Sequence, residues 1–142
     1  VKINDYQKER FAQKIIDHFG GDLTGKKIAI LGWAFKANTD DSRESASIYV
    51  TEKLHNAGAI ISIYDPKVKH EKIKHDILLY WKTKNDIDNN VFYSNEKITN
   101  DVNAVVVLSD WQEFKNIDYK KTIIFDGRNI VSERNNLITL GK

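Results

Sequence analysis

The sequence contains no cysteine among its 142 residues. Without a thiol, the chain cannot hold a disulfide framework or a zinc–thiolate site, and it supplies no cysteine nucleophile. It also lacks any run of about eighteen apolar residues, which a membrane-spanning helix would need. Residues 1–5 do not have the charged and apolar pattern of a signal peptide. We therefore expect a soluble, cytoplasmic protein.

The chain also lacks a block of like charge. Its 22 basic and 20 acidic residues leave a net charge of +2, and both signs are mixed along the sequence. Nucleic-acid-binding proteins usually gather basic residues on one face, so we expect neither a nucleic acid nor a membrane as a partner. Mixed charges favour a small ligand that a few cations bind. Hydrophobic residues make up 41% of the chain, which is sufficient for the core of one domain.

The first 20 residues predict an amphipathic helix. Asn4, followed three positions later by Gln7, resembles a capping box. Apolar residues at helical spacing form one stripe, which consists of Phe11, Ala12, Ile15, Ile16 and Phe19. Gly20 and Gly21 end the pattern, because glycine adopts the left-handed conformation that stops a helix. Two partners for the stripe stay open: the chain's own domain, or a missing domain or second subunit on which a linker helix docks.

From residue 26 onward, the pattern alternates between strands and helices. Short apolar runs predict strands at 27–31, 59–64, 90–93, 103–108 and 122–125. Helical patterns lie at about 44–56, 73–81 and 111–119. Units of strand, helix and strand form right-handed crossovers between parallel strands. The predicted fold class is α/β: a Rossmann-like, doubly wound parallel sheet with helices on both faces, in one domain from about residue 21.

Ligands of open parallel sheets bind beyond the carboxyl ends of the strands. This rule selects three segments, which are residues 32–43, 109–111 and 126–129. Two of these segments contain cations that suit a ligand with phosphate groups, namely Lys36, Arg43 and Arg128. A solvated surface side chain is the alternative for each of them.

The first of these segments does not carry the Gly-x-Gly-x-x-Gly pattern of dinucleotide sites. Gly32 is present, but Ala34 and Lys36 stand where further glycines would let the backbone approach a pyrophosphate. Asp65 follows the second strand as a ribose-binding carboxylate would, yet an Asp-Pro turn explains it equally well. We therefore expect no complete dinucleotide site. The four histidines lie at no metal-ligand spacing, so we predict no metal site.

Four segments, in the same order, resemble motifs of one family. Residues 31–45 read LGWAFKANTDDSRES, which resembles the signature that opens the C-terminal domain of the UDP-glucose/GDP-mannose dehydrogenases. Residues 63–68 read IYDPKV and residues 125–129 read FDGRN, and both are similar to further motifs of that family. Residues 4–12 read NDYQKERFA, which resembles the end of the helix that precedes this domain in the UDP-glucose 6-dehydrogenase branch. The resemblance covers nearly the whole chain and is weakest at 69–90.

The resemblance implies a division of labour between domains. In this family an N-terminal Rossmann domain binds NAD, a central helical domain builds the dimer, and the C-terminal domain closes over the nucleotide of the sugar. Residues 1–20 would then be the end of the inter-domain linker helix, and residues 21–142 the UDP-binding C-terminal domain. The chain would be a fragment of a homo-oligomeric enzyme, whose N-terminal and central domains are its partners.

The resemblance also implies roles for individual residues. Phe35, Lys36 and Arg128 would bind the UDP-sugar, and Arg43 would reach toward NAD across the domain interface. The full enzyme would oxidise UDP-glucose to UDP-glucuronate with two NAD, through a cysteine that this chain lacks. No catalytic residue is assigned to this chain, and NAD would be bound mainly by the N-terminal domain.

Two alternatives stay open. One is the same domain from a relative that oxidises GDP-mannose or a UDP-N-acetyl sugar, and the other is a stand-alone α/β binding module. Residues 4–12 and 126–129 favour the UDP-glucose branch, whereas the choice of sugar depends partly on residues outside this chain. The apolar stripe of the first helix argues against a stand-alone module, because it requires a partner.

Overall fold

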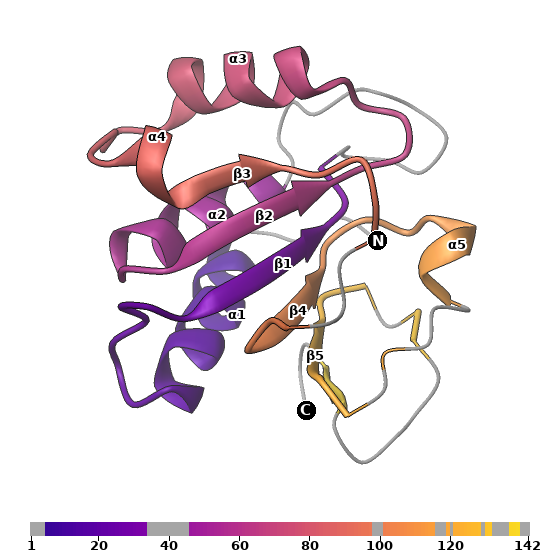
Figure 1. Cartoon of the computed structure of the whole chain (residues 1–142). Helices are drawn as coiled ribbons and strands as arrows, with labels where there is room; N and C mark the ends of the chain where they lie inside the picture. Colours follow the sequence, from indigo (N-terminus) through magenta and orange to yellow (C-terminus); the bar gives the residue numbers. More distant parts are fainter. Residues whose placement is uncertain are drawn as a thin grey trace.

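A six-stranded parallel sheet organises this chain in the computed structural model (Figure 1). The structure describes residues 5–33, 46–97, 101–115, 119, 121–128, 130, 131 and 137–139. The strands are β1 (Lys27–Leu31), β2 (Ile60–Tyr64), β3 (Val91–Tyr93), β4 (Ala104–Val107), β5 (Ile123–Asp126) and β6 (Leu137–Thr139). The helices are α1 (Asp5–His18), α2 (Ala46–Asn56), α3 (His70–Tyr80), α4 (Ile87–Asn90) and α5 (Gln112–Lys115).

The strand order defines the fold. Neighbouring strands all run parallel, in the order β3-β2-β1-β4-β5-β6. This order is that of the Rossmann fold, in which the chain leaves the central strand first toward one edge and then toward the other. The predicted fold class is therefore confirmed. β1 and β4 are neighbours at the centre, which is the point where the direction of winding reverses.

The two central strands are buried along nearly their whole length. Residues 28–31 of β1 and residues 104–107 of β4 are at most 1% exposed. Parallel strands that are covered on both faces read as continuous apolar runs, which is why the sequence predicted them closely. Toward the β3 edge the cover is thinner, because β2 alternates between buried and half-buried residues and Phe92 of β3 is 48% exposed.

The apolar stripe of α1 packs against the chain's own core. Phe11 and Ile15 are 0% exposed, and Ile16 and Phe19 are partly buried against the same core. α1 also contacts α2, and the two helices lie side by side behind the sheet in Figure 1. Our inference that the stripe requires a partner outside the domain is therefore wrong. The predicted cap at Asn4 lies outside the described residues.

Glycines in the left-handed conformation follow the ends of α1 and α2, and Gly20 and Gly21 are those that the sequence predicted. Gly20 and Gly21 after α1 have φ angles of 82° and 94°, and Gly58 after α2 has a φ of 106°. Residues with a side chain rarely adopt this left-handed region, so glycine is required there. α4 and β6 were not predicted from the sequence. Of the helices in the described ranges, none has the length and apolar character needed to cross a bilayer.

We predict that Ile15→Ala destabilises the 142-residue chain strongly. The side chain is fully buried, so its truncation should lower the free energy of unfolding by about 2–5 kcal/mol. Urea denaturation followed by circular dichroism measures this change. Glu9→Ala, on the exposed face of the same helix, is the control and should change stability by less than about 0.5 kcal/mol. An Ile15→Ala chain as stable as the control would show that α1 does not pack in this core.

Candidate nucleotide-binding site

The carboxyl ends of β1 and β4 approach each other closely at the reversal point. Gly32 follows β1 with a φ of +105°, and a Cβ atom added to it would lie 2.4 Å from the Cβ of Ser109. Ser109 is 0% exposed. Gly32 also donates its N–H to the Tyr64 carbonyl at 2.8 Å and accepts a hydrogen bond from Ser47 Oγ at 2.9 Å. Only glycine fits here, for reasons of both backbone angle and space.

A buried carboxylate joins the segments around this point. Asp65, at the end of β2, is 8% exposed. Its Oδ2 accepts hydrogen bonds from Trp33 N at 2.7 Å and from Trp111 Nε1 at 3.1 Å. Its Oδ1 accepts from the backbone N–H groups of Lys67 at 2.8 Å and Val68 at 3.1 Å. One side chain therefore holds together the segments that follow β1, β2 and β4. Of the two interpretations of Asp65, the structure supports the turn.

Trp33 is anchored at both of its ends. Its ring nitrogen Nε1 donates to Asp76 Oδ2 of α3 at 2.9 Å, while its backbone N–H is held by Asp65. Trp33 and Asp76 are both 0% exposed. Asp65 and Asp76 therefore fix the position of Trp33, the second residue after β1. Sequence reasoning did not single out Trp33, because nothing in the sequence shows a partner 43 positions away.

A second buried aspartate shapes the segment that follows β5. Asp126 is 0% exposed, and its two oxygens accept hydrogen bonds from Arg128 N at 3.0 Å, Ile130 N at 2.8 Å and Val131 N at 2.7 Å. Gly127 donates to the Val107 carbonyl at 2.9 Å, so this turn is tied to β4. Arg128 is half-buried at this corner of the sheet. Arg128 is the second residue after the carboxyl end of β5.

Of the four predicted site residues, Arg128 lies within the described part of the chain. Phe35, Lys36 and Arg43 lie outside the described residues, so their predicted roles stay predictions. The described end of their segment is Trp33, which donates its backbone N–H to Asp65 and follows Gly32, the glycine that lies against Ser109. Arg128 lies along the same edge, beyond the neighbouring strand pair β4 and β5.

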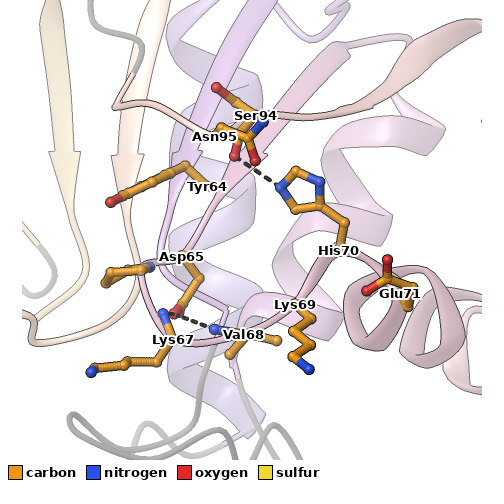
Figure 2. Close-up of a pocket in the computed structure, with 10 residues that line it drawn as sticks. Tyr64, Asp65, Lys67, Val68, Lys69, His70, Glu71, Ser94 and Asn95 are labelled. Atoms are coloured by element: carbon orange, nitrogen blue, oxygen red, sulfur yellow. Dashed lines mark hydrogen bonds between the residues drawn. The ribbon is translucent and has the colours of Figure 1, made fainter.

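A cavity of about 550 Å³ opens beyond the carboxyl ends of β2 and β3, lined by residues 64–71, 94 and 95. Figure 2 shows that the side chains of Lys67 and Lys69 point in different directions, and that His70 turns toward Ser94 instead. The His70 ring nitrogen Nε2 is 3.1 Å from the Ser94 carbonyl oxygen. The charged groups of this cavity therefore do not converge on one point.

Tyr64 connects this cavity to α5. Its hydroxyl donates to Glu113 Oε1 at 2.7 Å, and Lys97 Nζ is 3.3 Å from the same oxygen. Burial and the neighbouring Glu113 carboxylate raise the pKa of Tyr64, so the phenol stays a neutral donor at physiological pH. The ring of Tyr64 meets that of Phe114 at 6.2 Å between centroids. Within the described residues, no group of three or more His, Asp or Glu side chains could hold a metal ion.

Together, the strand order and this carboxyl edge define an α/β domain of the Rossmann type, a class whose ligands bind beyond the carboxyl ends of the strands. Residues 29–133 match the family described as "UDP-glucose/GDP-mannose dehydrogenase family, UDP binding domain". That match extends over most of the 142 residues, so the chain belongs to this family.

Full-length relatives resemble the chain over nearly all of it. UDP-glucose 6-dehydrogenase of Bos taurus is 41% identical over an alignment of 153 positions. The alignment covers 99% of this chain and 31% of that protein. UDP-glucose 6-dehydrogenase 4 of Arabidopsis thaliana is 39% identical over an alignment of 155 positions, which covers 93% of this chain and 32% of that protein. The chain thus spans about a third of the length of these curated relatives.

Solved structures share the fold. A UDP-glucose dehydrogenase from Pyrobaculum islandicum superposes with a TM-score of 0.74 at 26% identity, over 97% of this chain and 30% of that one. A UDP-D-ManNAc dehydrogenase from Pyrococcus horikoshii superposes with a TM-score of 0.64 at 24% identity, over 94% of this chain and 30% of that one. The second likeness concerns the fold alone.

We predict that Asp65→Asn destabilises the chain by about 1–3 kcal/mol, because one of the two donor pairs would then face an amide NH₂ group in place of an oxygen. Thermal and urea unfolding measure the loss. Asp88→Asn, an exposed aspartate of α4, makes the same chemical change and should alter stability by less than about 0.5 kcal/mol. Equal stability of the two variants would contradict the role of Asp65 as an anchor.

Proposed function

We propose that this chain binds the nucleotide part of UDP-glucose, as the C-terminal domain of a UDP-glucose 6-dehydrogenase. The observation that carries this proposal is the match to the family's UDP binding domain over residues 29–133. That range includes all three segments that follow β1, β4 and β5, where a parallel sheet of this order binds its ligand. Relatives called UDP-glucose 6-dehydrogenase, with about 40% identity, support UDP-glucose as the sugar nucleotide.

Within this proposal, Phe35, Lys36 and Arg128 contact the UDP-sugar. A diphosphate carries negative charge, and charge-assisted hydrogen bonds from an ammonium and a guanidinium suit it. The guanidinium of Arg128 offers a planar set of N–H donors, and the Asp126 turn holds its backbone. The negative charge of Asp126 is itself satisfied by three backbone N–H groups and is buried, so it does not compete for the arginine at the surface.

We do not expect a complete NAD site in this chain. The glycine pattern that would admit a pyrophosphate is missing, and the Asp65 carboxylate, which stands where a ribose-binding acid would be, is occupied by protein N–H groups. We propose that NAD is bound mainly by an N-terminal domain of the same enzyme, and that Arg43 reaches toward it across the domain interface.

The remaining parts of the proposal concern the whole enzyme. Oxidation of UDP-glucose to UDP-glucuronate removes four electrons from the C6 alcohol, which two NAD accept in turn. The nucleophilic cysteine would belong to another domain, and residues 1–20 would end the helix that links that domain to residues 21–142. We propose a cytoplasmic homo-oligomer. A UDP-N-acetyl sugar or GDP-mannose is the alternative substrate, because the fold is shared with dehydrogenases of such sugars.

We predict that the 142-residue chain binds UDP with about millimolar affinity, since its part of the pocket is open to water. Lys36→Ala and Arg128→Ala should each weaken this binding about tenfold, which corresponds to roughly 1.4 kcal/mol. NMR titration with UDP measures the affinity. Lys121→Ala removes an exposed cation before β5 and should leave the affinity unchanged. In the whole enzyme, the first two variants should raise KM for UDP-glucose. Wild-type affinity of both Lys36→Ala and Arg128→Ala would show that neither residue belongs to the UDP site.

We also predict that the purified chain forms no NADH from UDP-glucose and NAD. It has no cysteine and no glycine-rich dinucleotide pattern, so neither the nucleophile nor the cofactor site is present. NADH fluorescence under saturating substrate measures the reaction, and a whole UDP-glucose 6-dehydrogenase in the same buffer serves as the positive control. NADH formation that co-purifies with the chain through successive columns would contradict this prediction.

A further inference from the structure

The ring of Phe11 in α1 reaches the turn that follows β5. A Cβ atom added to Gly127 would lie 3.3 Å from both Cε2 and Cζ of Phe11, so the end of the ring packs closely against the backbone of Gly127. Phe11 is 0% exposed, and Gly127 is buried as well. Arg128 is the next residue along the chain. Helix α1 therefore contacts the backbone immediately before an arginine of the proposed UDP site.

The turn is held by two kinds of contact. Inside it, the oxygens of Asp126 accept hydrogen bonds from backbone N–H groups, including Arg128 N at 3.0 Å, and these bonds set the shape of the turn. Outside it, Gly127 donates its N–H to the Val107 carbonyl at 2.9 Å and has the Phe11 ring as a further neighbour. β4 and α1 therefore both contact Gly127, and together they set where the turn lies against the rest of the domain.

Helix α1 has a second contact with the same strand. About two turns after Phe11, the His18 ring meets the Phe125 ring edge to face, with 5.5 Å between their centroids. Phe125 and Gly127 lie on either side of Asp126, so α1 contacts the end of β5 both before and after the buried aspartate. α1 also packs in the core and against α2. The ring of Phe11 therefore has a defined position, because its helix cannot slide without breaking the other contacts.

Arg128 depends on its backbone for its place. It is half-buried, and within the described part of the chain no ion pair holds its guanidinium. The turn therefore determines from which point this side chain can reach a ligand. If the end of the Phe11 ring were removed, a space would open beside Gly127, and the turn could move into it.

We propose that Phe11 is a positioning residue for UDP binding, which acts through Gly127 on Arg128. This inference rests on the proposed role of Arg128 in the UDP site. The ring leaves the turn little free space on the side of α1, so the backbone of Arg128 is in place before the ligand arrives. Without the end of the ring, UDP would have to order the turn on binding, and this lowers affinity.

Phe11→Leu, Phe11→Met and Ile15→Val test the proposal in the 142-residue chain, at a temperature where circular dichroism shows each variant to be folded. Phe11→Leu removes the ring atoms that face Gly127 and should weaken UDP binding about threefold in an NMR titration. Phe11→Met keeps an apolar side chain that can fill the same space, and it should retain most of the affinity. Ile15→Val is the matched control, because it trims another fully buried side chain one turn further along α1. It should leave UDP affinity unchanged.

A second measurement does not depend on UDP. The backbone N–H groups of Gly127, Ile130 and Val131 donate the hydrogen bonds that hold the turn. Their hydrogen exchange, measured by NMR relative to the buried amides of β1, should be about three times faster in Phe11→Leu than in the wild type. It should keep the wild-type rate in Phe11→Met and in Ile15→Val. The comparison with β1 separates a local change in the turn from a general loss of stability.

Gly127→Ala disturbs the same contact from the side of the turn, and it serves as the test if Phe11→Leu does not fold. The added Cβ would lie 3.3 Å from the Phe11 ring and 3.2 Å from the Val107 carbonyl oxygen, so the turn has to shift. UDP affinity should again fall about threefold. Wild-type affinity of Gly127→Ala would contradict the proposal, since the place of the turn would then not matter for UDP.

The outcomes separate this inference from the proposed function. A wild-type chain that binds no UDP at any accessible concentration, or wild-type affinity of Arg128→Ala, counts against the proposed function. If both of those results agree with the proposed function, wild-type UDP affinity of Phe11→Leu overturns the positioning role. A loss of affinity that Ile15→Val shares, or equal exchange rates of the turn in the two variants, overturns it as well. In each of these cases, Phe11 is an ordinary core contact of α1.

Discussion

The carboxylate of Asp65 is the group on which the arrangement of the segments at the carboxyl edge of this sheet depends. Parallel strands end side by side, but the segments that follow them leave in different directions, and the backbone hydrogen bonds of the central strands continue for only one residue past each strand, at Gly32, Leu108 and Gly127. Asp65 continues the connection beyond that limit, since it accepts hydrogen bonds from Trp33, Trp111 and the turn at residues 67–68. The segments that follow β1, β2 and β4 are thereby held together at one edge of the sheet.

The aspartates of two sequence motifs have the same structural task. Asp65 in IYDPKV and Asp126 in FDGRN are both buried, and both use their oxygens for nearby N–H groups. This arrangement buries both carboxylates among backbone N–H groups and away from the surface. In both motifs the aspartate therefore has a structural role, because its side chain accepts the backbone hydrogen bonds that form the turn.

The sequence predicted the sheet well because fully buried parallel strands read as unbroken apolar runs, as in residues 27–31. It did not predict α4 and β6, which are too short to show periodicity. An apolar stripe on α1 reveals a buried face but not its cover, and here the cover is the domain itself. The place of Arg128 after β5 was predicted from the sequence, and its role in binding stays a prediction. Trp33 and Asp76 were missed, because long-range pairs of this kind leave no local signal.

The central pair of strands also sets an order in time. β1 pairs with β4, and Lys27 N bonds to the side chain of Asn103, a partner 76 positions later. During synthesis, one edge of β1 therefore stays unpaired after α1, β1 and β2 have been made, until β4 has left the ribosome. Contacts of such long range slow folding and expose apolar strand edges meanwhile. The edge of β1 that pairs with β4 therefore stays open to non-native strand pairing until residues 104–107 emerge.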